Sequence, residues 1–166
     1  MRLSLLPAMI AGKLTDLTPE FLKQQGIELL MLDFDNTIVP YTTSLATEEM
    51  DAWIRNILTT DIAVCVVSNS HKDRVKVFCN HYGMDCITHA KKPFSKGIRQ
   101  CLEKYKIPAS RAALVGDQIF TDTLGANGCG VRPILVKAIH NHNFWLKARH
   151  ALELPFIFAA RKRKIS

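Results

Sequence analysis

Short apolar runs alternate with segments of helical periodicity along most of the chain. The apolar runs that predict buried strands span residues 28–34, 62–67, 85–89, 112–115 and 131–136. Apolar residues at helical spacing predict helices over 47–58, 72–82, 95–105 and 121–127. Strands that alternate with helices in this way form parallel βαβ units. The sequence therefore predicts an α/β fold, a Rossmann-like doubly wound sheet of five mostly parallel strands.

Several helix ends carry local signals of their own. Thr47 and Ser95 stand where an N-cap is expected, because their hydroxyls can accept a hydrogen bond from the first turn. Gly83 is expected to end the helix over 72–82, and Gly128 lies near the predicted end of the last helix.

The N-terminal stretch superficially resembles a signal peptide. Its apolar run is short, is broken by Pro7 and is soon followed by Lys13, so we expect no cleaved leader. No stretch approaches the roughly 20 apolar residues of a membrane span. The five cysteines are odd in number and form no C-x-x-C pair, which indicates free thiols in a reducing compartment. The chain is expected to be cytoplasmic.

The net charge of +7 is concentrated at the C-terminal end. Residues 140–166 hold six of the basic residues and one acidic residue, so +5 of the +7 lies there. We therefore expect two parts, a catalytic domain over 1–140 and a basic, aromatic-containing tail over 141–166. The tail suits an anionic membrane surface, although a terminal helix packed on the sheet accounts for its pattern as well. A charge of this size also admits phosphorylated substrates and nucleic acid.

Polar residues follow four of the predicted strands. They are Asp33, Asp35 and Thr37 after the first, Ser68 and Asn69 after the second, Lys92 shortly beyond the third, and Asp117 and Asp122 after the fourth. The carboxyl ends of parallel strands share one edge of a sheet, where ligands bind. We expect these side chains to form one site.

Each of these signals has a modest alternative when it is taken alone. Asp33 and Asp35 repel each other unless a cation such as Mg²⁺ relieves the repulsion, but an Asx turn would also explain the pair. Ser68 and its neighbours could hold a phosphate or cap a helix. Lys92 could offset phosphoryl charge or be a surface lysine. Asp122 could orient metal-bound water or cap the next helix. Their order and common placement favour a catalytic site.

Together the motifs resemble the haloacid dehalogenase (HAD) superfamily: D-x-D-x-T, a strand-end Ser, a Lys and G-D-x-x-x-x-D over residues 28–136. The resemblance implies that Asp33 attacks phosphorus to form an aspartyl-phosphate and that Asp35 acts as acid and base. It further implies that Mg²⁺ binds to Asp33, the backbone carbonyl of Asp35 and Asp117. Ser68 and Lys92 would bind the phosphoryl group, with Thr37 and Asn69 beside the substrate and Asp122 in support.

No cap domain fits between these motifs, so the site is expected to be open to large substrates. The chain resembles more closely the uncapped YqeG family, subclass IIIA. The matching segments are Leu6-Pro7, Leu22-Lys23-x-x-Gly26-Ile27 and residues 33–39, 67–70, 90–93 and 115–122. That family is similar to phosphatidylglycerophosphate phosphatases, so an anionic lipid substrate and peripheral membrane contact are expected. The alternatives are a phosphatase of nucleic-acid ends or phosphoproteins, and a non-catalytic basic adaptor. No RNA-binding signature accompanies the tail, so no nucleic-acid partner is expected.

Overall fold

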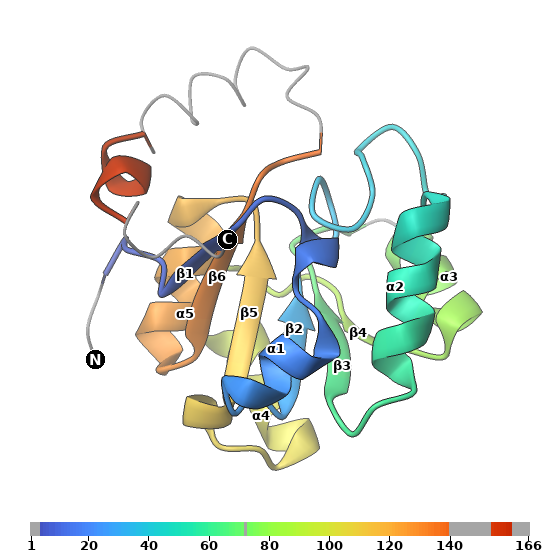
Figure 1. The fold of residues 1–166 in the computed structure, drawn as a ribbon, viewed down its shortest axis with the longest axis horizontal. Coiled ribbons are helices and arrows are strands. Elements are labelled where there is room, and N and C mark those ends of the chain that lie inside the picture. Colours follow the sequence, from blue (N-terminus) through green and yellow to red (C-terminus); the bar gives the residue numbers. More distant parts are fainter. Residues whose placement is uncertain (1–3, 72, 140–153, 161–166) are drawn as a thin grey trace.

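The computed structural model describes residues 4–71, 73–139 and 154–160, and these build a six-stranded parallel sheet (Figure 1). The strands are β1 (Met9–Ala11), β2 (Leu29–Leu32), β3 (Ala63–Val67), β4 (Asp85–Ile87), β5 (Ala112–Gly116) and β6 (Arg132–Val136). Their order across the sheet is β1-β6-β5-β2-β3-β4. The chain moves outward from β2 to β4, crosses back to β5 and continues in the opposite direction. The crossover makes the β2–β5 boundary the switch point, where ligands of such sheets bind.

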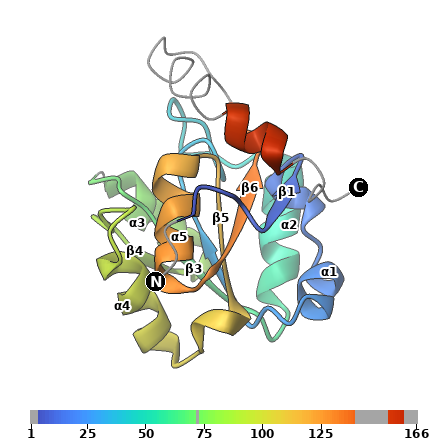
Figure 2. The ribbon, with the colours of Figure 1, turned by 90° about the vertical axis from the view of Figure 1, so that its left-hand side faces the viewer.

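Helices cover both faces of the sheet. They are α1 (Pro19–Gln24), α2 (Glu48–Leu58), α3 (Asp73–Tyr82), α4 (Lys96–Tyr105) and α5 (Leu124–Cys129). Figure 2 shows α1 and α2 on one side of the sheet and α4 and α5 on the other. Successive residues of a strand point to opposite faces, so β2 gives Leu30 and Leu32 to one core and Leu29 and Met31 to the other. The doubly wound fold predicted from the sequence is confirmed.

The structure corrects the predicted fold at one strand. A sixth strand, β1, pairs with β6 and comes from the stretch that superficially resembled a signal peptide. It is only three residues long, which gives too few positions for a period to be recognised. Helix α1 was also missed, although Thr18 caps it by accepting from the Phe21 amide.

Two predicted helix ends are also corrected. Thr47 caps α2 as predicted, by accepting from the Met50 amide, but the Ser95 side chain makes no capping bond at α4. The last helix starts earlier than predicted, with a π-helical turn over Ile119–Thr123. It ends at Cys129, next to Gly128 as predicted, and Gly130, with a φ of 73°, is its C-cap. Gly83, with a φ of 68°, follows α3 as predicted.

The insertion between β2 and β3 is small. It consists of the loop over residues 36–47 and helix α2, and the part of the chain that the structure describes contains no cap domain. All five cysteines are free, as predicted. No helix among the described residues is long and apolar enough to cross a membrane.

Part of the predicted tail lies against the rest of the fold. Residues 154–159 are helical, Ala160 is buried, and the Phe156 ring lies 6.3 Å from that of Phe120. Both views place this segment beyond the end of β6, near β1 (Figures 1 and 2). The proposed boundary at residue 140 and the basic cluster over 161–164 lie outside the described residues, so both stay predictions.

Candidate active site

A buried lysine joins two acidic side chains at the switch point. Asp33 follows β2, and its amide donates to the Val115 carbonyl of β5 at 2.8 Å. The Lys92 ammonium lies 2.6 Å from Asp33 Oδ1 and 2.7 Å from Asp122 Oδ1, and the lysine side chain is 1% exposed. Such a lysine cannot change its position freely. It holds two carboxylates that are 89 positions apart in the numbering of the chain.

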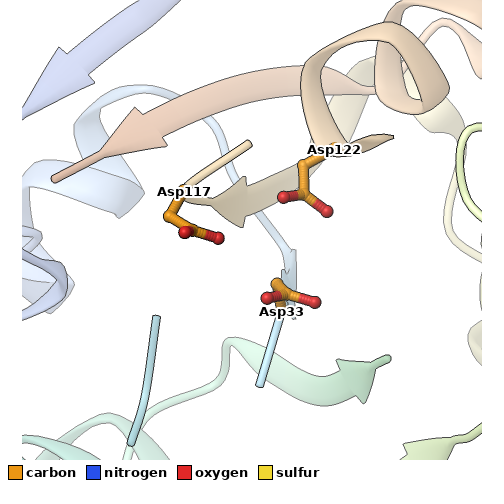
Figure 3. A group of neighbouring side chains, drawn as sticks. All are labelled: Asp33, Asp117 and Asp122. Atoms are coloured by element: carbon orange, nitrogen blue, oxygen red, sulfur yellow. The ribbon is translucent and has the colours of Figure 1, made fainter. Parts of the chain in front are cut away.

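A third carboxylate completes an acidic cluster. Asp33, Asp117 and Asp122 each present an oxygen within 4.8 Å of the others, and Figure 3 shows their side chains gathered at one edge of the sheet. Gly116 makes the close approach of Asp122 possible. A Cβ at position 116 would lie 2.2 Å from Asp122 Oδ2, so only glycine fits without movement.

Burial dominates the electrostatics of this cluster. Desolvation raises the pKa of Asp33 to about 7, with Lys92 opposing the shift and Asp122 adding to it. Desolvation also raises the pKa of Asp117 to about 8, and the neighbouring Asp33 and Asp122 raise it further. Burial alone would lower the pKa of Lys92, but Asp122 and Asp33 outweigh that effect and raise it. When these carboxylates are all ionised, one ammonium faces more negative charge than it can balance.

The acidic cluster fits a hard divalent cation. Asp117 Oδ1 is buried and accepts no hydrogen bond from the residues that the structure describes. Buried carboxylate oxygens normally have partners, and Mg²⁺ prefers oxygen ligands of this type. An ion beside Asp33 and Asp117 would supply the missing positive charge.

Five of the eight predicted site residues line one open cavity of about 420 Å³, and Thr37, Asp117 and Asp122 are not among its lining residues. Asp33, Asp35, Ser68, Asn69 and Lys92 all line it. The lining also includes residues that the sequence reasoning missed: Tyr41, Ser70, His71, Gln118 and Thr121. Tyr41 lies in the 36–47 loop, outside the sequence motifs.

Asn69 and Thr37, which were predicted to lie beside the substrate, are placed differently in the structure. The Asn69 side chain accepts from the Lys92 amide at 2.7 Å and donates to the Lys92 carbonyl at 2.9 Å, so it ties the lysine loop to the end of β3. Thr37 is buried, is not among the lining residues, and its Oγ1 has no hydrogen-bond partner among the described residues. Ser68 Oγ accepts from the Ser70 amide at 3.0 Å while lining the cavity.

Comparison with known proteins identifies a relative that is named as a phosphatase. The chain is 30% identical over 159 residues to the Bacillus subtilis protein named "Probable phosphatase YqeG", covering 96% of this chain and 92% of that protein. The chain belongs to the YqeG-like family of HAD-type phosphatases. A HAD-hydrolase-like family model matches residues 89–147, which include Lys92, Asp117 and Asp122.

Solved structures related to this YqeG-like phosphatase share its fold. The cobalt-bound deoxy-D-mannose-octulosonate 8-phosphate phosphatase of Haemophilus influenzae aligns with a TM-score of 0.56 at 14% identity, over 85% of this chain and 93% of that one. A HAD subfamily III A hydrolase of Legionella pneumophila aligns with a TM-score of 0.54 at 12% identity, over 87% and 90% of the two chains. At these identities the likeness concerns the fold. The predicted fold class is thereby confirmed, and the predicted family is confirmed by the 30% identity to the Bacillus subtilis protein.

Proposed function

We propose that this YqeG-like phosphatase hydrolyses phosphate monoesters with Asp33 as the nucleophile and Mg²⁺ as the cofactor. The observation that carries the proposal is the arrangement of Asp33, Lys92 and Asp117. A buried carboxylate held at 2.6 Å by an ammonium lies beside a second carboxylate that has an unpartnered oxygen. A purely structural ion pair would not require a further buried acid whose oxygen lies within 4.8 Å of an Asp33 oxygen.

The reaction would proceed in two displacements. An Asp33 oxygen attacks phosphorus and forms an aspartyl-phosphate, while the bond from phosphorus to the ester oxygen breaks. Asp35, which lines the same cavity, donates a proton to the leaving oxygen. A water molecule then attacks phosphorus and gives a proton to Asp35, which releases inorganic phosphate and restores Asp33. Asp35 thus gives up one proton in the first displacement and regains one in the second.

Residues around the nucleophile would divide the binding work. Asp33, Asp117 and the backbone carbonyl of Asp35 would hold Mg²⁺. When bound, the ion supplies positive charge that offsets the carboxylates and the phosphoryl oxygens. Lys92 and Ser68 face the cavity and would bind the phosphoryl group. Asp122 pairs with Lys92 and accepts from the Gln118 amide at 3.2 Å, so its role would be to hold Lys92.

We further propose that the substrate is an anionic phospholipid with a terminal phosphate, such as phosphatidylglycerophosphate. Large apolar side chains are exposed on segments next to the cavity. Tyr41 lines it and is 44% exposed, and Leu45 in the same loop is 79% exposed. Phe94, two residues beyond Lys92, is 73% exposed. Phe158 is 55% exposed on the segment that packs on Phe120. Of these four residues Tyr41 lines the cavity. Exposed apolar side chains near an open site suit contact with the acyl chains of a lipid.

A phosphate-release screen tests this proposal. The substrates are phosphatidylglycerophosphate in anionic vesicles, a nucleotide, a 5′-phosphorylated oligonucleotide and a phosphopeptide, each with Mg²⁺ and with excess chelator. We expect the lipid to be the best substrate, chelator to abolish release, and Ca²⁺ to inhibit because its larger shell misplaces the nucleophile. Release from the oligonucleotide or phosphopeptide alone would replace the lipid assignment. Full activity in chelator would rule out the metal-dependent mechanism.

A further inference from the structure

An arginine outside all the sequence motifs contacts the predicted acid and base, Asp35. Arg74 lies in the first turn of α3, and its Nη2 lies 3.2 Å from Asp35 Oδ1. Both side chains are 14% exposed. An ion pair with so little exposure is weakly screened, and removing one partner leaves the other charge poorly solvated.

The same guanidinium holds the loop that borders the cavity. Nη2 donates to the Pro40 carbonyl at 2.9 Å and the Thr43 carbonyl at 2.8 Å, and Nη1 donates to the Tyr41 carbonyl at 2.6 Å. These bonds span residues 40–43, whose Tyr41 side chain lines the cavity. One side chain therefore links the end of β2, the start of α3 and the loop.

The position of the guanidinium is restricted from a further side. It lies over the Phe34 ring, with Cζ 5.0 Å from the ring centroid, and Phe34 separates the two predicted catalytic aspartates in the sequence. A planar fork can stack on a ring and bond to several carbonyls at once. A lysine ammonium has no such plane, so it cannot reproduce the whole set of contacts.

We propose that Arg74 is a positioning residue that orients Asp35 toward the leaving oxygen of the substrate. The proposal rests on the proposed function, because it assigns Asp35 the proton transfer described above. The pair with Oδ1 restrains the position of that carboxylate oxygen, and the three bonds to the loop hold Arg74 itself. Proton transfer requires the acid within hydrogen-bond reach of the leaving oxygen. Loss of Arg74 removes this restraint from the Asp35 side chain, while Asp33 keeps its contact with Lys92.

A leaving-group comparison separates this role from a merely structural one. An alkoxide is a poor leaving group and depends on the acid, whereas p-nitrophenolate departs with little help. For Arg74→Met, we expect kcat on an alkyl phosphate such as glycerol 3-phosphate to fall by about 100-fold, and kcat on p-nitrophenyl phosphate to fall by less than about fivefold. An equal loss of kcat on both substrates, or a rise in KM alone, would overturn the proposal.

A double-mutant cycle tests whether Arg74 acts through Asp35. If it does, Asp35→Asn/Arg74→Met loses no more kcat on the alkyl phosphate than Asp35→Asn alone. Losses that multiply would contradict the proposal. Arg55→Met is the matched control, because Arg55 is 62% exposed on α2 and pairs with Asp51 at 2.8 Å. This control should keep wild-type kcat on both substrates.

A conservative variant covers the case in which Arg74→Met does not fold. Arg74→Lys keeps the charge, and we expect a loss of about tenfold on the alkyl phosphate with little change on the aryl phosphate. Equal losses on both substrates would overturn the positioning role. Failure of the proposed function has a different signature. In that case the wild-type protein and Arg55→Met release no phosphate from either substrate, and the role of Arg74 fails with it.

Discussion

At the scale of single residues, Gly116 shows how closely the acidic cluster is packed. A Cβ at this position would approach three Asp122 side-chain atoms to 2.2–2.7 Å. Asp122 is 3% exposed in its pair with Lys92, so it has little room to yield. We expect Gly116→Ala to lower kcat by about 100-fold, because a displaced Asp122 releases the Lys92 ammonium from Asp33. Phosphate release together with a thermal melt measures the effect.

Gly12 provides a matched control for that substitution. Its added Cβ would lie 2.8 Å from Asp16 Oδ2, which also belongs to an aspartate but on the exposed surface. This exposed carboxylate can rotate away, at the cost of the hydrogen bond that its Oδ2 accepts from the Lys13 amide at 2.9 Å, and no residue of the site is displaced. Gly12→Ala should therefore keep wild-type kcat, and an equal loss in both variants would argue against a special role for the packing at Gly116.

Asp117 is expected to limit the stability of the metal-free protein. Its pKa is raised to about 8, so the folded state keeps a proton that the unfolded chain has lost above about pH 4. In chelator, the free energy of unfolding should therefore fall as the pH rises from about 4 to about 8. Asp117→Asn removes the part of this dependence that Asp117 contributes, while Asp33, whose pKa is also raised, keeps its own part. We expect the substitution to raise the melting temperature at pH 8 by about 2–4 °C, for a gain of about 1 kcal/mol.

Magnesium should reverse the order of the melting temperatures of the wild-type protein and Asp117→Asn. An ion that binds the folded state stabilises it by mass action, so wild-type protein should melt higher in Mg²⁺ than in chelator. Asp117→Asn lacks one carboxylate of the proposed site and should show little Mg²⁺-dependent shift. Melting curves at pH 6 and pH 8 provide the measurement, and an equal Mg²⁺ shift in both proteins would contradict the assignment of Asp117 as a ligand.

At the scale of elements, Trp53 fastens α2 to the N-terminal part of the chain. Its indole Nε1 donates to the Leu17 carbonyl at 2.9 Å, and the residue is 7% exposed. Trp53→Phe leaves that buried carbonyl without its donor, which costs about 2 kcal/mol. We expect the melting temperature to fall by about 4–8 °C. The kcat should not change, because Trp53 does not line the cavity.

The elements with strong periodicity could be predicted from the sequence. β2 and β5 are buried at every position, so their sequences are continuous apolar runs. α2 carries an apolar stripe and a Thr47 cap, so its helical period could be recognised. β1 could not be predicted, because its three residues become a strand only through pairing with β6. The π-helical turn over Ile119–Thr123 could not be predicted either, because such turns are rare single-turn features of helices.

Some residues of the candidate site could likewise be predicted from the sequence, and others could not. Residues at strand ends could be brought together from topology alone, since parallel strands end at one edge. Arg74 and Tyr41 could not, because one lies within a helix and the other in a loop whose path depends on the contacts between them. The role of Asn69 was also hidden, since its bonds to Lys92 join segments 23 residues apart.

At the scale of the whole molecule, the C-terminal stretch combines positive charge with exposed apolar side chains. Residues 140–166 carry +5 of the net charge, and the described part of this stretch packs on Phe120 beside the cavity-lining Gln118 and Thr121. If the substrate is an anionic lipid, the basic cluster over residues 161–164 should attract the protein to the bilayer. Each basic residue near such a surface contributes about 1 kcal/mol, so the cluster adds roughly 4 kcal/mol at low salt.

Truncation after Ala160 tests that attraction. The shortened chain should sediment less with anionic vesicles, and the difference should shrink at high salt because of screening. Hydrolysis of a soluble phosphoester should not change, because the site residues all lie before residue 124. Equal, weak sedimentation of both proteins at two salt concentrations would remove the membrane role of the tail and favour soluble substrates.

The nucleophile assignment is tested most directly by phosphate release from Asp33→Asn in Mg²⁺, with Asp61→Asn as the matched control. Asp61 is fully exposed and 3.8 Å from Lys23, away from the cavity. Asparagine is nearly isosteric with aspartate but is a far poorer nucleophile. We expect Asp33→Asn to lose about 10³-fold or more in kcat while remaining folded, and Asp61→Asn to match the wild type. Phosphate release by folded Asp33→Asn at the wild-type rate would contradict the account.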